Sequence, residues 1–297
     1  MRVDPNLSSI LNSGIQSTQQ ALQTSVQQLS SGLSVSTPSD NPYAEAADIR
    51  SLAQSANVDT YTQNGDTVLA QAQMADSTLS SVVTQLTQAV SLGTEGANGT
   101  TSTEDRSAIA AQVQDILQQV ISLANTQYSG ANLFAGTAGV SQAFAANSAS
   151  PGGYSYEGNS GVNQVAIGEG LNVNTNIPGD QIFTNPDGNV LGSLSQLASA
   201  LSTGSTADIA TATAAVSSAI SIVDQQRAVY GGTVNEINAQ ESYLSQETVS
   251  LTSQQQNLTG IDMATVISNM TQAQTANSAL LAAAAKVLPT SLLDYLN

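Results

Sequence analysis

The sequence has neither cysteine nor histidine in its 297 residues, and lysine and arginine together number only five. The usual zinc ligands, thiol nucleophiles, disulfides and the commonest general base are therefore missing. With 22 carboxylates the net charge is −17, so the chain cannot form the basic stripe that nucleic acid requires, and an anionic membrane surface would repel it. We therefore expect no enzyme, no metal or cofactor, and no nucleic-acid or membrane partner.

Charged and aromatic residues are also scarce. Charged residues make up 9% of the chain, against roughly 25% in an ordinary domain, and aromatics make up 4%, with no tryptophan and three phenylalanines. Burial must then come from Leu, Ile, Val and Ala, which favours thin helical layers and coiled coils over a thick core. Residues 1–6 lack the basic and apolar parts of a secretory signal peptide. The longest Ala/Leu run, residues 279–285, is far shorter than the roughly 20 residues of a membrane span.

Apolar residues recur every three or four positions over residues 11–33, 49–90 and 109–123, which predicts three helices. A loop with two prolines separates the first from the second, and we expect Asn41 to cap the second helix. Ser102 and Asp105 have the spacing of a capping box at the start of the third. The short Gly-rich break between the second and third helices predicts an antiparallel hairpin.

The helical period disappears between residues 136 and 204, where Gly, Asn and Pro become frequent. Alternation in residues 153–158, 162–168 and 171–174 predicts a small antiparallel β region. Its side chains favour an ordered region over a disordered one, because they offer something to bury. These side chains are Tyr154, Tyr156, Val165, Ile167 and Phe183.

The clearest regularity is an apolar residue at every seventh position, which predicts a long helix packed along its length. The positions are Ile209, Val216, Val223, Tyr230, Ile237, Leu244, Leu251 and Leu258. The complementary positions include polar residues, so we expect a helix in a bundle and not a two-stranded zipper. The stripe is interpreted as core of the chain's own bundle, with contact between subunits as the alternative. Gly231–Gly232 is a weak point in this helix.

Ser205 with Asp208 is expected to cap this helix, and Thr259 with Asp262 is expected to cap the final one, which we expect to end at Pro289. The first and last helices each carry an apolar stripe and hardly a charge, so we expect them to pair. The predicted fold class is mainly α with a small antiparallel β domain inserted mid-chain. The predicted domains are a terminal paired-helix domain (1–42 with 262–297), a helical rod (43–136 with 205–261) and a β-rich outer domain (137–204).

Several short segments, in order, resemble the flagellin superfamily. Residues 28–33 resemble the "QLSSG" end of its N-terminal helix. Residues 97–100, followed by Asp105 and Arg106, resemble its "ANGT…DR" segment. Arg227 with the Tyr-Gly pair at 230–231 resembles the "R…G" element that opens its C-terminal half.

Other segments are similar to members of that superfamily from the hook–filament junction. Residues 37–42 are similar to "TPSDDP", and residues 132–137 are similar to "YLFAGT". Residues 156–161 with 178–183 resemble "Y-x-G-D-S-G…G-x-x-F", and residues 291–296 resemble the C-terminus. The resemblance covers nearly the whole chain and implies an elongated, flagellin-like rod.

The resemblance implies a structural subunit of the bacterial flagellum that forms an adaptor ring on which flagellin polymerises. It implies a homo-oligomer, hook-associated protein 1 on the hook side, flagellin on the distal side, and a flagellar export chaperone. It also implies an extracellular protein that leaves through the flagellar type III channel without a cleaved signal peptide. A filament flagellin and a surface adhesin acting through the β-rich domain are the alternatives.

Lack of charge and the resemblance together make the terminal helices candidates for contact between subunits. The candidates are Leu11, Ile15, Leu22, Val26, Leu29, Leu33, Val266, Met270, Leu280, Val287, Leu292, Leu293 and Tyr295. Arg50, Arg106 and Arg227 are candidates for fixing subunit register, since Arg can clasp a carboxylate, and a solvated helix charge is the alternative. Residues 98–100 (Asn-Gly-Thr) match a glycosylation sequon and also the composition of an ordinary turn.

Overall fold

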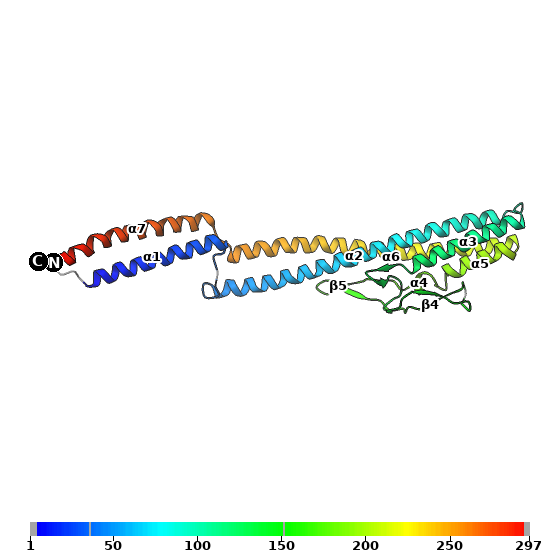
Figure 1. The fold of residues 1–297 in the computed structure, drawn as a ribbon, viewed down its shortest axis with the longest axis horizontal. Helices are drawn as coiled ribbons and strands as arrows, with labels where there is room; N and C mark the ends of the chain where they lie inside the picture. The colour runs from blue at the N-terminus through cyan, green and yellow to red at the C-terminus, as the bar shows by residue number, and fades with distance from the viewer. Residues whose placement is uncertain (1–4, 36, 151, 294–297) are drawn as a thin grey trace. The chain divides into compact units, whose positions relative to one another are not determined.

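A computed structural model describes residues 5–35, 37–150 and 152–293, and they divide into two compact units (Figure 1). Unit 1 comprises residues 1–57 and 246–297, and unit 2 comprises residues 58–245. Two long helices contribute to both units: α2 (Pro42–Gly96) and α6 (Thr206–Thr259). Unit 1 is therefore built from two segments that are distant in the sequence, whereas unit 2 is one continuous stretch.

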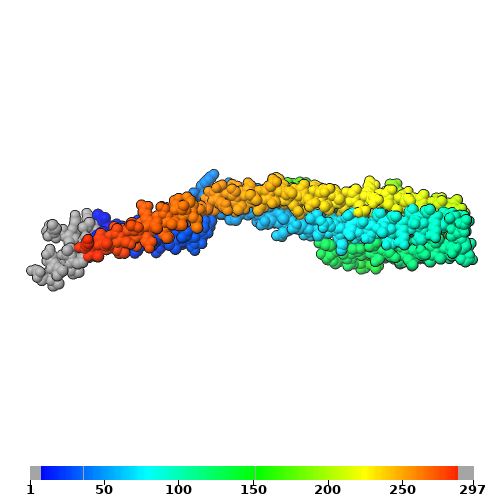
Figure 2. All heavy atoms as spheres, turned by 90° about the horizontal axis from the view of Figure 1, so that it is seen from above, coloured from blue at the N-terminus to red at the C-terminus, as the bar shows by residue number. Residues whose placement is uncertain are grey.

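Unit 1 contains the first and last helices of the chain, packed side by side. They are α1 (Pro5–Ser31) and α7 (Met263–Leu293). Figure 2 shows α1 in blue against α7 in orange and red. The expected pairing of the terminal helices is confirmed.

Unit 2 adds α3 (Thr103–Ala124), the single turn α4 (Gly179–Ile182) and α5 (Val190–Thr203) to its parts of α2 and α6. Between α3 and α5 lie three two-stranded antiparallel sheets. They pair β1 (Gln127–Tyr128) with β2 (Ala131–Asn132), β3 (Phe144–Ala146) with β4 (Tyr154–Tyr156), and β5 (Gln164–Gly168) with β6 (Leu171–Asn174). The predicted mainly α class with a small antiparallel β insertion is confirmed.

Three of the predicted helix starts are confirmed. Asn41 Oδ1 accepts the amide of Ala44 at 3.2 Å, and α2 begins at Pro42. Ser102 Oγ accepts the amide of Asp105 at 3.1 Å before α3. Asp208 and Ser205 form a reciprocal capping box, in which Asp208 Oδ2 accepts the Ser205 amide and Ser205 Oγ accepts the Asp208 amide.

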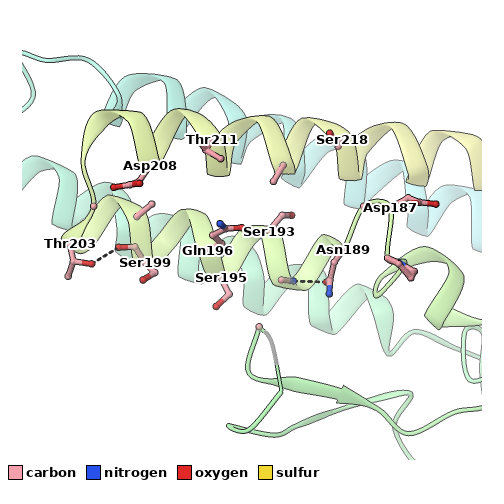
Figure 3. A pocket seen from close by; sticks show the side chains of 17 residues that line it. Asp187, Asn189, Ser193, Ser195, Gln196, Ser199, Thr203, Asp208, Thr211 and Ser218 are labelled. Atoms are coloured by element: carbon pink, nitrogen blue, oxygen red, sulfur yellow. Dashed lines mark hydrogen bonds between the residues drawn. The ribbon is translucent and has the colours of Figure 1, made fainter.

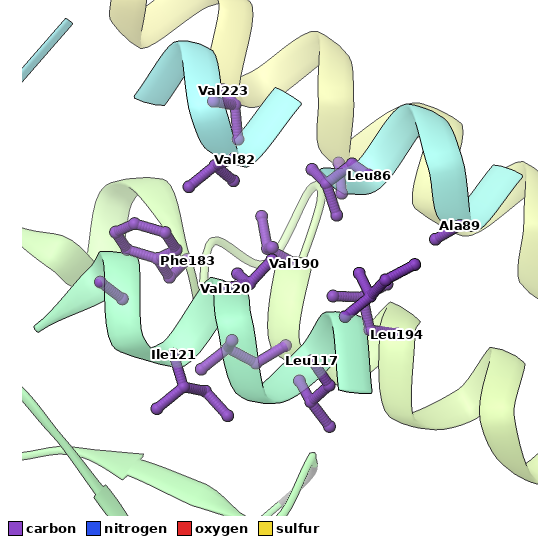
Figure 4. Packing of buried hydrophobic residues seen from close by; sticks show 14 of the residues in the cluster. Val82, Leu86, Ala89, Leu117, Val120, Ile121, Phe183, Val190, Leu194 and Val223 are labelled. Carbon is purple, nitrogen blue, oxygen red and sulfur yellow. The ribbon is translucent and has the colours of Figure 1, made fainter. Parts of the chain in front are cut away.

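The heptad stripe of α6 lies in the core of its own chain. Seven of its eight residues, from Ile209 to Leu251, are buried, and Leu258 is half-buried. From Ile209 to Tyr230 the stripe lies in one apolar cluster with residues of α2, α3 and α5, and Figure 4 shows this cluster around Leu86, Val120, Val190 and Leu194. Ile237 lies in a second cluster with Val68, Ile167 and Val173. The interpretation of the stripe as bundle core is confirmed for these residues.

The three phenylalanines of the chain gather where the β region meets the helices. Phe183 packs edge-on against Phe134 and Phe144, with ring centroids 5.4 and 5.3 Å away, and Phe144 also contacts Tyr156. Tyr156 and the buried Tyr230 each accept a backbone amide through the hydroxyl, and burial raises the pKa of each to about 12. The few aromatics thus anchor the β region to the helical body.

The structure corrects the expectation that residues 136–204 lack helical periodicity. Residues 190–203 form α5, and its Leu191, Leu194, Leu197 and Leu201 are all buried. Their spacing of three and four is the helical period, which the intervening Ser, Gly and Ala residues obscure. Packing against α3 makes this short helix part of the core.

Two further expectations are wrong. The last helix runs through Pro289 to Leu293, although proline offers no amide to the helix there. Ile49 and Leu52, assigned to an apolar stripe, lie on the exposed side of α2, while Ser51 and Val58 point inward. The spacing of three and four between apolar residues correctly predicted a helix here, but it assigned the wrong face of α2 to the interior.

Candidate assembly surface

The α1–α7 pair of unit 1 buries little of its own apolar surface. Among residues 8–31 and 263–286, only Ser25, Val266 and Ala273 are buried. The helices approach closely at Gly14, where Leu280 Cδ1 would lie 3.3 Å from an added Cβ. A two-helix layer leaves the outer side of each helix uncovered, so apolar side chains of the pair remain exposed to solvent.

The predicted contact residues fall into three groups. Val266 is buried, and six are half-buried between the helices: Leu11, Ile15, Leu22, Leu29, Met270 and Leu280. Val26 and Leu33 are exposed. The side chains of Val287, Leu292 and Leu293, and the whole of Tyr295, lie outside the described residues.

Exposed large apolar side chains concentrate in unit 1. Ten such residues of the described chain belong to unit 1 and four to unit 2. The ten are Ile10, Val26, Leu33, Tyr43, Ile49, Leu52, Val249, Met263, Ile267 and Leu281. Single exposed apolar residues are ordinary on a protein surface, but this concentration is typical of an interaction surface. Sequence periodicity found Val26 and Leu33 and missed Ile10, Met263, Ile267 and Leu281.

The helices α1 and α7 are nearly without charge. Residues 5–31 contain no Asp, Glu, Lys or Arg, and residues 263–293 contain only Lys286. A surface of Ala, Ser, Gln, Thr and aliphatic side chains can be covered without burying an unpaired ion. A shallow hollow of about 490 Å³ on α1, lined by Leu22, Gln23, Val26, Gln27 and Ser30, lies on this face.

Backbone hydrogen bonds join the two connections in unit 1. The Ser34 amide donates to the Thr259 carbonyl at 2.6 Å, and the Ile261 amide donates to the Gly32 carbonyl at 3.3 Å. Gly32 has φ +73°, a conformation that favours glycine. Thr259 therefore serves as the acceptor that ties the α1–α2 loop to α6, and Asp262 alone takes the capping role expected of both.

Asp262 caps α7. Its Oδ2 accepts the Thr265 hydroxyl at 2.9 Å and its Oδ1 accepts the Ala264 amide at 3.0 Å. The Thr265 hydroxyl, followed by the amides of Ala264 and Thr265, lowers the pKa of Asp262. The helix α7, whose only charged residue is Lys286, thus begins at an ionised carboxylate, which also suits the helix dipole.

The three arginines proposed for register have different surroundings. Arg227 Nε lies 3.0 Å from Asp76 Oδ1 on α2, and its Nη1 lies 3.5 Å from Asp224, so its partners are in its own chain. Arg50 is exposed, and its Nε donates to the Ala46 carbonyl at 3.0 Å. Arg106 is half-buried in the first turn of α3. Within the described residues, Arg50 and Arg106 form no ion pair.

A polar hollow lies between α5 and α6 (Figure 3). Its volume is about 880 Å³, and Ser195, Gln196, Ser199, Thr211 and Ser218 line it. Other lining groups already have structural roles: Asn189 Oδ1 accepts the Gly192 amide as the cap of α5, and Asp208 caps α6. The part of the chain that the structure describes holds no cluster of metal-binding side chains.

By length and composition alone, α6 is apolar enough to cross a membrane. Only 28% of its most apolar window is buried, as expected for a helix with one buried stripe. The same helix supplies Ile209, Val216 and Val223 to the core, which is the ordinary role of such a helix. The apolar composition of α6 is therefore weak evidence for a membrane span.

Comparison with known proteins relates the chain to flagellar proteins. Residues 5–139 match the bacterial flagellin N-terminal helical region, and residues 213–296 match its C-terminal helical region. The flagellar hook-associated protein 3 of Escherichia coli K12 is 30% identical over 275 residues, which is 84% of this chain and 85% of that protein. Its Salmonella typhimurium LT2 counterpart is 34% identical over 126 residues, which is 42% of this chain and 39% of that protein.

Solved structures share the fold. A flagellar hook-associated protein from Vibrio parahaemolyticus has a TM-score of 0.68 and 22% identity, covering 74% of this chain and 100% of its own. The flagellar junction protein from Legionella pneumophila has a TM-score of 0.60 and 15% identity, covering 72% and 100%. The chain therefore belongs to the bacterial flagellin family, with flagellar hook-associated protein 3 among its relatives, and is a structural protein and not an enzyme.

Proposed function

We propose that this chain is the subunit of an adaptor ring at the hook–filament junction, on which flagellin polymerises. The observation that carries the proposal is the α1–α7 pair, which leaves an uncharged apolar surface uncovered. The similarity to relatives named flagellar hook-associated protein 3 supports this position in the flagellum. In a closed ring, the same surface of every copy would be covered by its neighbour.

The charge distribution supports a homo-oligomer held by these helices. Copies with a net charge of −17 repel each other, and the repulsion is smallest where the contact surfaces carry no ions. Burying apolar area stabilises a contact by about 25 cal/mol per Å² before the costs of association. Arg50 remains a candidate for register in such a contact, while Arg227 serves register between α6 and α2 within the chain.

Neighbours at the two edges of the ring complete the proposal. We assign hook-associated protein 1 to the hook side and flagellin to the distal side. Before assembly, an export chaperone would cover the apolar stripe of α7 in a groove, and the chain would pass unfolded through the flagellar type III channel to the cell exterior. The terminal domain (1–42 with 262–297) would then form the inner contacts, and the strands β3 to β6 of the β-rich region would form the outer surface.

The test uses a strain without the chain, complemented with variants. We expect the deletion strain to secrete unpolymerised flagellin beyond intact hooks, and the wild-type chain to restore filaments. The double variant Val26→Asn with Ile267→Asn should fail to restore filaments. It replaces two apolar side chains, 50% and 45% exposed in the free chain, with polar amides at the proposed contact between subunits. Val162→Asn in unit 2, at a residue that is 42% exposed, is the matched control and should restore them.

Normal filaments in the deletion strain would overturn the junction role. Growth of long filaments from the pure chain would instead identify a filament flagellin. Loss of surface binding with filaments intact would identify an adhesin. That outcome is tested by deleting the strands of the β-rich region, and the deletion must end before α5, because Leu191, Leu194 and Leu197 belong to the core.

A further inference from the structure

The chain contains two Asn-Gly pairs, Asn64–Gly65 and Asn98–Gly99, in contrasting surroundings. An Asn followed by Gly is chemically vulnerable, because glycine has no side chain to shield its backbone nitrogen from the neighbouring side-chain amide. The reaction, loss of the side-chain amide nitrogen, requires that the glycine nitrogen donates no hydrogen bond. It also requires that the asparagine side chain folds back toward that nitrogen. The fold therefore decides which of the two pairs can react.

Asn98–Gly99 lies in the exposed turn between α2 and α3. Asn98 Oδ1 accepts the Thr100 amide at 3.3 Å and the Thr100 hydroxyl at 3.0 Å, so the side-chain amide is folded over the backbone that follows it. Both bonds draw electrons from the amide carbon and make it a better electrophile. Within the described residues, the Gly99 amide donates no hydrogen bond.

Asn64–Gly65 lies in the middle of α2 and is protected. Asn64 Nδ2 donates to the Ala166 carbonyl of β5 at 2.9 Å, which holds the side chain away from its own backbone. Gly65 is buried, 3.6 Å from Ile237 Cγ2 at its Cβ position, and its amide belongs to the helix ladder. The surroundings therefore permit the reaction at Asn98 and hinder it at Asn64.

We propose that Asn98 is a site of spontaneous, non-enzymatic deamidation in the folded protein. The Gly99 nitrogen loses its proton and forms a bond to Asn98 Cγ; the Cγ–Nδ2 bond breaks and ammonia leaves. Water then opens the five-membered imide at either carbonyl, giving aspartate or isoaspartate. Water is the only co-reactant, and the step changes no oxidation state.

The product alters the connection between α2 and α3. The net charge goes from −17 to −18, with the new carboxylate close to Glu95 and to the C-terminal end of α2, where negative charge is unfavourable. Isoaspartate also adds a methylene to the main chain inside a turn now closed by the Thr101 amide on the Asn98 carbonyl at 3.0 Å. This inference is independent of the proposed function.

One peptide reports on both sites. Arg50 and Arg106 are consecutive among the basic residues, so trypsin releases residues 51–106 with both Asn-Gly pairs in it. The folded, full-length chain is incubated at mildly alkaline pH and analysed by fragmentation mass spectrometry. We expect the acid form at Asn98 to accumulate while Asn64 stays an amide. In denaturant, where nothing protects Asn64, both should convert.

Gly99→Ala is the matched variant. A Cβ at Gly99 meets nothing within 4 Å and its φ is not positive, so the variant should fold normally and lose the modification. An unmodified Asn98 in the incubated folded protein, or equal conversion of Asn64 and Asn98, would refute the proposal. So would a sugar on Asn98 in protein isolated from its source, since a glycosylated amide cannot react this way.

Discussion

At the scale of single residues, polar side chains set where two of the long helices begin. Asp208 and Asp262 each use a carboxylate to cap a long helix, and hydrogen bonds lower the pKa of both. For Asp208 the main donor is the Ser205 amide, and for Asp262 it is the Thr265 hydroxyl. A folded-state pKa below the unfolded one contributes stability above the unfolded pKa, and that stability is lost as pH falls through the folded pKa.

Asp262→Asn should therefore uncouple the start of α7 from pH. Asparagine caps a helix about as well as aspartate and does not titrate. On acidification below the ordinary range of Asp, we expect the wild-type chain to lose amide protection in the first turn of α7 and the Asn variant to keep it. Hydrogen exchange of residues 263–267, corrected for intrinsic rates, measures this.

Asp262→Ala provides the control for that prediction. It removes the acceptor for the Ala264 amide, so protection should be low at every pH. If the wild-type chain and the Asn variant lose protection together on acidification, the carboxylate is not the group responsible.

At the scale of elements, two helical glycines differ in what surrounds them. At Gly93, near the end of α2, an added Cβ would meet Leu197 Cδ1 at 3.2 Å and collide with Thr213 Oγ1, so glycine allows α2 to approach α5 and α6. Gly232, in the middle of α6, is exposed with nothing within 4 Å of its Cβ position. Packing within the chain therefore requires glycine at position 93 and does not require it at position 232.

The substitution to alanine should have opposite signs at these two positions. Gly232→Ala should raise the free energy of unfolding by about 1 kcal/mol, because alanine favours the helix and fills no occupied space. Gly93→Ala should lower it, because the clash exceeds that gain. Urea unfolding followed by circular dichroism gives both values. An unchanged or lower stability for Gly232→Ala would mean that α6 needs the local freedom of glycine there.

The elements also mark how far the sequence could predict the fold. The seven-residue period of α6 identified its buried side because the same stripe is buried over many turns. It could not show that Ile49 and Leu52 face outward, since both faces of α2 carry apolar residues and only the tertiary partner decides between them. Four leucines of α5 had the correct spacing, but 14 residues between glycine-rich turns were too few to stand out.

At the scale of the whole molecule, the sequence predicted which helices would pair and could not predict how much they would leave uncovered. Val26 and Leu22 lie on one stripe, yet one is exposed and the other half-buried, a difference that depends on the number of neighbours. The short pair of terminal helices has one partner per helix, whereas the helices of unit 2 share a core with several. The periodicity of the apolar residues predicts which helices pair, and only the scarcity of charge in the terminal helices indicates that much of their surface stays uncovered.

This difference predicts unequal stability within one chain. In the free protein, residues 8–31 and 263–286 should exchange their amides much faster than the α6 turns around Val216 and Val223, because a two-helix layer with three buried side chains is marginal in water. Assembly should slow exchange in the terminal helices most, since neighbours cover their uncharged faces. Comparing exchange in the free and assembled protein tests this directly. Equal protection of the terminal helices and α6 in the free chain would mean that the pair is stable alone, and the apolar surface of unit 1 would then require another explanation.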